Sequence, residues 1–170
     1  RGLGDVYKRQ MIVNFKSLEK NSRVWVFQSL DFIDDRLVEE IKEKISSFLS
    51  KWKSHQKDFK SSFEIRYNTF IIIAADEGNL VSGCSIDSLI NFIKDLENSY
   101  ELQLLDKLHV KYIENGKIIT QHLNQFKIYC QSLGKNDNLV VFNNLVKDIN
   151  ELENNWQVNI KDSWHNRFIK

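Results

Sequence analysis

Cys84 is the residue of this chain whose type and surroundings best suit nucleophilic chemistry. It lies in the segment S-G-C-S-I-D, just before apolar residues that recur at helical spacing. The amino terminus of a helix can lower the pKa of a thiol, because its partial positive charge stabilises the thiolate. We nevertheless favour a small buried residue that packs the loop, since free cysteines are commonly buried.

A thiol nucleophile also needs a base, and the chain contains four histidines that could serve: His55, His109, His122 and His165. Spacing alone does not select among them. The two cysteines of the chain are far apart and lack C-x-x-C spacing. This pattern favours reduced thiols over a disulfide framework or a zinc site.

Three acidic residues near Cys84, namely Asp76, Glu77 and Asp87, could supply oxygen ligands to a divalent cation. Each also has a local structural role. Asp76 and Glu77 end an apolar run, because unpaired charges do not enter a dry core. Asp87 suits the positive end of a helix dipole. We favour the structural interpretation and therefore predict no metal site and no cofactor.

Small polar residues in the same segment could bind an anion. Ser82, Gly83 and Ser85 would present backbone amides at the start of a helix. Asn143 and Asn144 follow a later strand and would line the same end of the sheet, or would only cap a helix. These residues are our candidates for a ligand site, together with the two acids at 76 and 77.

The C-terminal segment is rich in aromatic residues for an otherwise polar stretch. An interaction surface could be formed by Trp156, Trp164, His165, Arg167 and Phe168, because Trp and Arg are favoured at binding hot spots. The alternative, which we prefer, is a segment that folds back onto the body of the protein, since a solvated tail rarely carries such side chains.

The strand predicted at 70–75, F-I-I-I-A-A, positions the central candidates. It is continuously apolar, too short to cross a bilayer, and of the right length for a strand buried on both faces. Gly78 provides turn freedom after it. Ser85 then suits the N-cap of a helix that runs to about Tyr100. The resulting strand, polar loop and helix are a common setting for ligands.

Other elements follow from periodicity and turn residues. Asn115-Gly116 between alternating runs predicts a β-hairpin, because both turn positions favour positive φ. An edge strand before residue 68 turns at Asn68-Thr69 into the central strand. The remaining predicted elements are a strand at 23–29, helices at 37–52, 123–133 and 145–156, and a strand at 139–142.

This order predicts a single α+β domain over residues 11–170, with helices packed on a mixed or mainly antiparallel sheet. The first six elements have the order β-α-β-β-α-β of ferredoxin-like folds, and a C-terminal β-α extension follows. With 170 residues, of which 42% are hydrophobic, the chain can form one domain with a substantial core.

The formal net charge of +1 argues against nucleic acid as a partner. The sequence has neither a long apolar run nor a signal peptide, so we expect a cytoplasmic protein without membrane insertion. Residues 1–10, R-G-L-G-D-V-Y-K-R-Q, look like translated sequencing-adapter read-through, and we expect the protein to start at Met11.

Several stretches together resemble an uncharacterised bacterial family, found mainly in Bacteroidetes, whose members often carry the name "ABC transporter ATPase". The matching stretches are R-V-W-V-F-Q-S at 23–29, W-K-S-H at 52–55, F-I-I-I-A-A-D-E at 70–77, S-G-C-S-I-D-S at 82–88, V-F-N-N-L-V at 141–146 and W-Q-V-N-I-K-D-S-W-H-N-R-F at 156–168. The resemblance covers nearly the whole chain after Met11. Its most specific parts are S-G-C-S-I-D and S-W-H, which makes His165 our first choice of base for Cys84.

The resemblance implies an ATPase, but the residues do not support one. Binding of ATP phosphates in such enzymes requires G-x-x-x-x-G-K-[ST], and neither this motif nor L-S-G-G-Q occurs in the chain. Our first hypothesis is therefore a non-catalytic domain that binds a small molecule or a protein. The second is a small thiol or acid–base enzyme that uses Cys84 or Asp87 with His165.

Overall fold

The strand Phe70–Ala75 (β3) is the centre of the first of two antiparallel sheets in the computed structural model, which describes residues 12–53, 59–76, 82–134 and 137–169. It pairs on one side with Arg23–Gln28 (β1) and on the other with Ser61–Arg66 (β2). The predicted central and edge strands are thus confirmed. Their turn, however, lies at residues 67–69, with positive φ at Tyr67 and Asn68.

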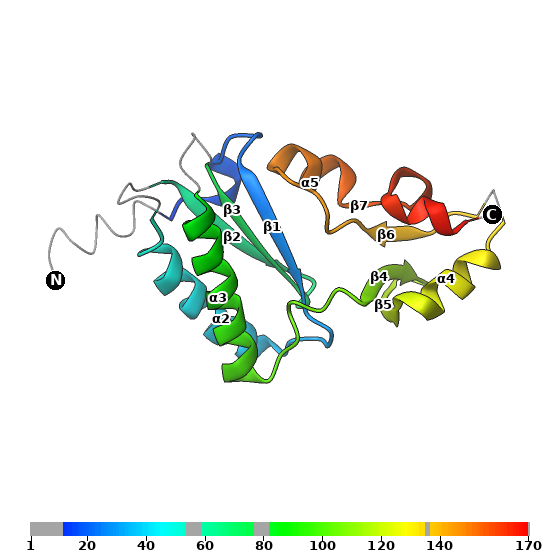
Figure 1. Cartoon of the computed structure of the whole chain (residues 1–170), viewed down its shortest axis with the longest axis horizontal. Coiled ribbons are helices and arrows are strands. Elements are labelled where there is room, and N and C mark those ends of the chain that lie inside the picture. The colour runs from blue at the N-terminus through cyan, green and yellow to red at the C-terminus, as the bar shows by residue number, and fades with distance from the viewer. Residues whose placement is uncertain (1–11, 54–58, 77–81, 135–136, 170) are drawn as a thin grey trace, which may run out of the picture.

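Both faces of β3 are buried because two separate layers cover them. Ile71, Ile73 and Ala75 face the helices Asp35–Leu49 (α2) and Gly83–Tyr100 (α3). Phe70 and Ile72 face the other way, toward a cluster that includes residues of the helix Ile149–Asn155 (α5). Figure 1 shows α2 and α3 on one side of this sheet and α5 on the other. This two-sided cover explains the continuous apolar run.

The sequence of helix α2 explains both where the helix begins and which of its faces is buried. The Asp34 carboxylate accepts a hydrogen bond from the backbone N–H of Leu37 at 2.9 Å, which caps the helix. Val38, Ile41 and Ile45 then lie on the buried face, while the charged residues between them are mostly exposed.

The second sheet has the strand order β5-β4-β6-β7 and is also antiparallel. Its strands are His109–Glu114 (β4), Lys117–His122 (β5), Val140–Phe142 (β6) and Gln157–Asn159 (β7). The predicted Asn115-Gly116 turn joins β4 and β5, with positive φ at both residues. The helix Leu123–Gln131 (α4) packs on one face, where Val110 and Tyr112 meet Phe126.

The order β-α-β-β-α-β and the α+β class are confirmed, but β4 belongs to the second sheet and does not pair with β1. The outer edge of β1 is bridged instead by the segment before α5, where the backbone N–H of Val24 donates to the carbonyl oxygen of Lys147 at 2.9 Å. The two sheets therefore meet along this edge, and a junction between them forms.

The C-terminal segment folds back onto the second sheet, as we expected. After β7 it forms two short 3-10 helices, Ile160–Asp162 (η2) and Trp164–Phe168 (η3), and a third one, Phe15–Ser17 (η1), lies near the start of the described chain. Ile160 and His165 are buried. In Figure 1 this segment and α4 flank the second sheet at the right-hand end of the molecule.

Two predicted helix starts were wrong. Helix α3 begins at Gly83 with Ser82 as its N-cap, and not after Ser85. Helix α5 begins at Ile149 and not near Leu145, because the Asp148 carboxylate accepts a hydrogen bond from the backbone N–H of Glu151 and caps the helix there. None of the helices in the described residues is both long and apolar enough to cross a membrane.

Candidate functional site

The corner after β3, where we expected a ligand, uses its serines to hold α3 in place. The Ser82 hydroxyl accepts a hydrogen bond from the backbone N–H of Ser85 at 3.3 Å. Ser85 is buried, and its hydroxyl donates to the carbonyl oxygen of Lys53 at 3.1 Å. The indole N–H of Trp52 donates to the carbonyl oxygen of Ser85 at 2.9 Å. These bonds tie the start of α3 to the segment after α2.

The other candidates at this corner are exposed or undescribed. Cys84 lies in the first turn of α3 and is exposed, so our preferred buried interpretation was wrong. Gly83 and Asp87 are also exposed, and Asp76 is half-buried. Glu77 lies outside the described residues, as does His55. A side chain at position 83 would point into open space, so no close approach requires glycine there.

The structure does not bring Cys84 and His165 together. Cys84 stands at the start of α3, on the first sheet, whereas His165 is buried in the C-terminal segment on the second sheet. Figure 1 shows these two elements apart, with α3 toward the left of the molecule and the red C-terminal segment at its right-hand end. The Cys84–His165 and Asp87–His165 pairings that we considered for catalysis therefore lack the required contact.

Asn143 and Asn144 lie at the junction of the two sheets, not at the corner after β3. Asn143 forms the turn after β6, where its side chain accepts a hydrogen bond from the backbone N–H of Leu145 at 3.2 Å. Asn144 is the middle of a polar bridge. It accepts from the indole N–H of Trp156 at 3.0 Å and donates to the Gln28 side chain at 3.0 Å. Gln28 in turn donates to the carbonyl oxygen of His109 at 3.2 Å.

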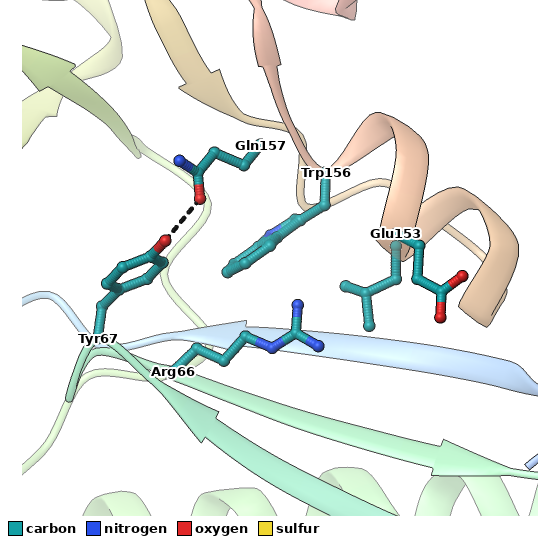
Figure 2. A pocket seen from close by; sticks show the side chains of 6 residues that line it. Arg66, Tyr67, Glu153, Trp156 and Gln157 are labelled. Carbon is teal, nitrogen blue, oxygen red and sulfur yellow. Dashed lines mark hydrogen bonds between the residues drawn. The ribbon is translucent and has the colours of Figure 1, made fainter. Parts of the chain in front are cut away.

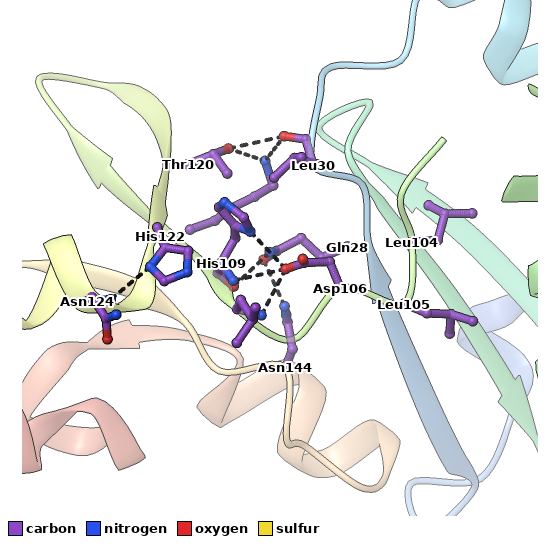
Figure 3. Close-up of polar contacts among 12 residues, drawn as sticks. Gln28, Leu30, Leu104, Leu105, Asp106, His109, Thr120, His122, Asn124 and Asn144 are labelled. Carbon is purple, nitrogen blue, oxygen red and sulfur yellow. Dashed lines mark hydrogen bonds and ion pairs between the residues drawn. The ribbon is translucent and has the colours of Figure 1, made fainter. Parts of the chain in front are cut away.

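A cavity of about 750 Å³ lies beside this bridge. We call it the inter-sheet cavity, because β1 and α3 on the first sheet and β4 and the C-terminal segment on the second all contribute to its lining. Figure 3 shows Gln28, Asp106, His109 and Asn144 gathered at this place, with Leu104 and Leu105 to one side. Four of our predicted site residues line it: Asn144, Trp164, His165 and Arg167.

Asp106 and His109 form a pair on the cavity wall. One carboxylate oxygen of Asp106 lies 2.9 Å from Nδ1 of His109 and also accepts the backbone N–H groups of Leu108 and His109. Burial alone would raise the pKa of Asp106, but the hydrogen bonds from His109 and Leu108 outweigh it and hold this pKa below its usual value. The carboxylate thus favours a proton on Nδ1, and in the neutral ring Nε2 of His109 is then the acceptor.

His122 faces His109 across the β4–β5 pair, with ring centroids 5.3 Å apart and perpendicular rings. Its Nδ1 accepts a hydrogen bond from the backbone N–H of Asn124 at 3.2 Å and so caps α4. Figure 3 shows this cap beside the Asp106–His109 pair. Among the described residues, no group of three or more His, Cys, Asp and Glu side chains could hold a metal ion.

His165 is a buried neutral histidine. It is 1% exposed, and its Nδ1 lies 2.6 Å from the hydroxyl of Ser163. Burial, with a smaller contribution from the nearby charge of Arg167, lowers the pKa of His165 to about 4. Its ring stacks on Trp164 with centroids 3.8 Å apart, and the Arg167 guanidinium lies 4.9 Å from the Trp164 ring. The segment is therefore a clasp on the second sheet that also presents Trp164 and Arg167 to the cavity.

This arrangement contains a base and the residue that orients it, but no hydroxyl or thiol nucleophile among the described lining residues. The described residues that line the inter-sheet cavity include no serine, threonine or cysteine. An Asp–His pair without a nucleophile can position a ligand by hydrogen bonding or accept a proton from it. The geometry thus suits ligand binding better than covalent catalysis.

Sequence reasoning missed Gln28, Asp106, Lys107 and the role of His109. Only His109 was considered, as one of four possible bases. The signal that could have found the pair is Asp106 three residues before His109, directly ahead of a strand with apolar residues at 110 and 112. Such an acid commonly accepts the backbone N–H groups of the following residues.

A second hollow, of about 550 Å³, lies between the end of β2 and α5. Figure 2 shows Tyr67, Trp156 and Arg66 around it, with the Tyr67 hydroxyl donating to Gln157 at 2.7 Å. The Arg66 guanidinium lies 5.3 Å from the Trp156 ring and pairs with Glu64 at 2.7 Å. Since the charge of Arg66 is neutralised by Glu64, this hollow is a weaker candidate for an anion.

Comparison with known proteins adds no assignment. No protein-family model matches the sequence, and no curated protein or solved structure matches the chain.

Proposed function

We propose that the protein is a non-catalytic binding protein of the cytoplasm, and that its inter-sheet cavity holds a small organic acid with an apolar body. The observation that carries this proposal is the cavity of about 750 Å³ at the junction of the two sheets. Small-molecule sites in proteins commonly have volumes of roughly 300–1,000 Å³, mainly apolar walls and a few convergent polar groups.

The apolar part of the ligand would contact side chains from both sheets. Leu105 comes from the segment before β4, Leu123 from the start of α4, and Phe142 from the end of β6. The Trp164 ring, held by its stack on His165, adds a flat aromatic surface. Leu145 lies at the rim with 66% of its surface exposed, where a ligand would cover it.

The charges at the cavity favour an anion. Lys107 and Arg167 are exposed cations that line it, and Arg167 makes no ion pair within the described part of the chain. Asp106 is the single acid among the described lining residues, and one of its two carboxylate oxygens accepts all three N–H donors. A carboxylate on the ligand would therefore find two cations against one acid.

The lack of a hydroxyl or thiol nucleophile among these lining residues supports binding over catalysis. The enzyme hypothesis depended on Cys84 or Asp87 acting with His165, and these residues lie on different sheets. We also propose that the chain belongs to the Bacteroidetes family that it resembles. ATP hydrolysis remains unsupported, because the sequence has no G-x-x-x-x-G-K-[ST] motif.

Isothermal titration calorimetry with decanoate, decanol and decylamine tests this proposal. The three probes share an apolar chain and differ in the charge of the head group. We expect the affinity order decanoate, decanol, decylamine, because the cavity presents cations. Equal affinity for the three probes, or no binding of decanoate, would contradict the proposal.

Substitution of Arg167 tests whether its positive charge contributes to ligand binding in the inter-sheet cavity. Arg167→Met should weaken decanoate binding about fivefold, the loss expected for an exposed ion pair of about 1 kcal/mol. Binding of decanol should not change. Arg36→Met is the matched control, because Arg36 is an exposed arginine on α2 that does not line the cavity. If both variants weaken decanoate binding equally, the cavity is not the site.

A further inference from the structure

Lys111 is a buried lysine at the junction of the two sheets, on the side away from Asp106. It lies in β4 opposite Thr120 of β5, and only 3% of its surface is exposed. Its Nζ donates to the carbonyl oxygen of Leu30 at 3.1 Å and to the Thr120 hydroxyl. Figure 3 shows Leu30 and Thr120 next to each other at this point. Lysine is seldom buried, so its position requires an explanation.

A separate cavity of about 730 Å³ opens beside Lys111. Its lining comes from the β4–β5 hairpin, the loop between β1 and α2, and the turn between β2 and β3. Ile113 and Ile118 provide apolar surface inside it, and Phe32 lies on it with 71% of its surface exposed. An exposed aromatic ring beside a hollow that contains a buried amine suits a ligand with an apolar body.

The amine is more easily deprotonated than an ordinary lysine. Burial lowers the pKa of Lys111 to about 8, while the nearby charge of Asp31 acts in the opposite direction. The titratable side chains that share the cavity with Lys111 are Asp31, Asp35 and Tyr67. Asp35 accepts a hydrogen bond from Asn68, and Tyr67 donates to Gln157. About one-tenth of the Lys111 amines would be neutral at pH 7, against fewer than about one in a thousand for a solvated lysine.

The hydrogen bonds of Lys111 leave one position on its nitrogen open to the cavity, and in the neutral form this position is the lone pair. A neutral amine has two N–H bonds and one lone pair, and two acceptors, Leu30 and Thr120, are present. The lone pair is then left for a reaction partner. We propose that Lys111 forms a Schiff base with an aldehyde or ketone held in this cavity by Phe32, Ile113 and Ile118. This site is independent of the anion-binding function proposed for the inter-sheet cavity.

The chemistry balances without an oxidant or a reductant. The nitrogen lone pair forms a bond to the carbonyl carbon, and the electrons of the C=O π bond move to oxygen, which takes up a proton. The resulting carbinolamine loses its oxygen as water when the C=N bond forms. The two protons of the amine leave in that water molecule, and solvent in the open cavity relays them.

Reductive labelling of the wild-type protein tests this directly. Benzaldehyde with sodium cyanoborohydride at pH 7 converts each imine to a stable benzylamine, which peptide mapping by mass spectrometry locates. We expect Lys111 to be labelled at least tenfold faster than Lys117, an exposed lysine of the same hairpin. Labelling of Lys111 at the rate of Lys117, or more slowly, would overturn the proposal.

Two variants sharpen the test without changing the amine. Asp31→Asn removes the carboxylate that favours the charged form, so labelling of Lys111 at pH 7 should accelerate about twofold to threefold. Asp87→Asn, an exposed acid on α3, should leave the rate unchanged. A rate that is unchanged or lower in Asp31→Asn would contradict the role of the cavity charges and with it the proposal. A third variant, Lys111→Arg, replaces the amine with a guanidinium, keeps the positive charge and should abolish the fast labelling.

Discussion

The corner after β3 and the junction between the two sheets both carry polar side chains next to an apolar core. At the corner these groups either face solvent, as Cys84 does, or serve the helix, as Ser82 and Ser85 do. At the junction they are enclosed by apolar residues from both sheets. Lys111 and His165 are 3% and 1% exposed.

The two regions differ in which polar groups are buried: a serine at the corner, and a lysine and a histidine at the junction. A serine at a helix start is explained by the hydrogen bond that it accepts. Burial removes water from a lysine or histidine side chain and disfavours its charged form, so the buried position of such a residue requires a further explanation. The junction therefore holds the side chains that the fold alone does not account for.

Breaking the polar bridge should have the largest effect on stability. Asn144→Ala removes the acceptor of the Trp156 indole N–H and the donor to Gln28, and both partners are buried. We expect a loss of about 2–3 kcal/mol in the free energy of unfolding, because buried polar groups would be left without partners. Urea denaturation measures this loss.

Asn143→Ala is the matched control, since within the described part of the chain the neighbouring Asn143 side chain accepts one hydrogen bond, from the backbone of Leu145. It should cost about 0.5–1 kcal/mol. Equal losses in the two variants would show that the polar bridge between the sheets contributes no more to the free energy of unfolding than an ordinary turn. The energetic difference that we infer between the corner and the junction would then be contradicted.

Acidification should have the next largest effect, through His165. Its pKa in the folded protein is about 4, below the ordinary value of 6.5. The unfolded chain therefore binds a proton that the folded protein does not, and stability is lost as the pH falls from about 6.5 toward 4. We expect the wild type to lose about 1–2 kcal/mol more than His165→Asn between pH 7 and pH 5, as measured by urea denaturation. Parallel pH curves for the two proteins would contradict the burial of a neutral His165.

The exposed thiol should have the smallest effect. Cys84→Ser should change stability by less than about 0.5 kcal/mol, because the side chain is exposed. Iodoacetamide should modify Cys84 in the folded protein. It should reach Cys130 only after unfolding, since Cys130 is buried and burial raises its pKa to about 11. Protection of Cys84 in the folded protein would show that the corner is more enclosed than the structure indicates.

Much of the fold could be predicted because its signals are local. The continuous apolar run of β3, the Asn115-Gly116 turn and the helical spacing of Ile41 and Ile45 all led to the observed elements. The strand β7 was missed, because its three residues carry no periodicity. The start of α3 was misplaced because Ser85 also suits an N-cap; in the structure the Ser82 hydroxyl caps the helix, and the Ser85 hydroxyl bonds to Lys53 after α2 instead.

The candidate site was harder to predict, because it depends on how the two sheets meet. Trp164 and Arg167 were identified from their residue types, which are favoured at binding sites, and Asn144 from its position after a strand. Their meeting with Gln28 and Asp106 follows from β4 joining the second sheet, which no local pattern indicates. Lys111 was not considered, because a lysine that alternates with Val110 and Tyr112 in a strand is normally expected on the solvent-exposed face.

The most direct test of the central claim is a ¹H–¹⁵N correlation spectrum of the protein titrated with decanoate. Binding in the inter-sheet cavity predicts the largest shift changes at the Trp164 indole, Leu123 and Arg167, with the amides of Ser85 and Asp87 unchanged. Changes centred on the start of α3, or none at saturating decanoate, would contradict the assignment of the junction as the ligand site.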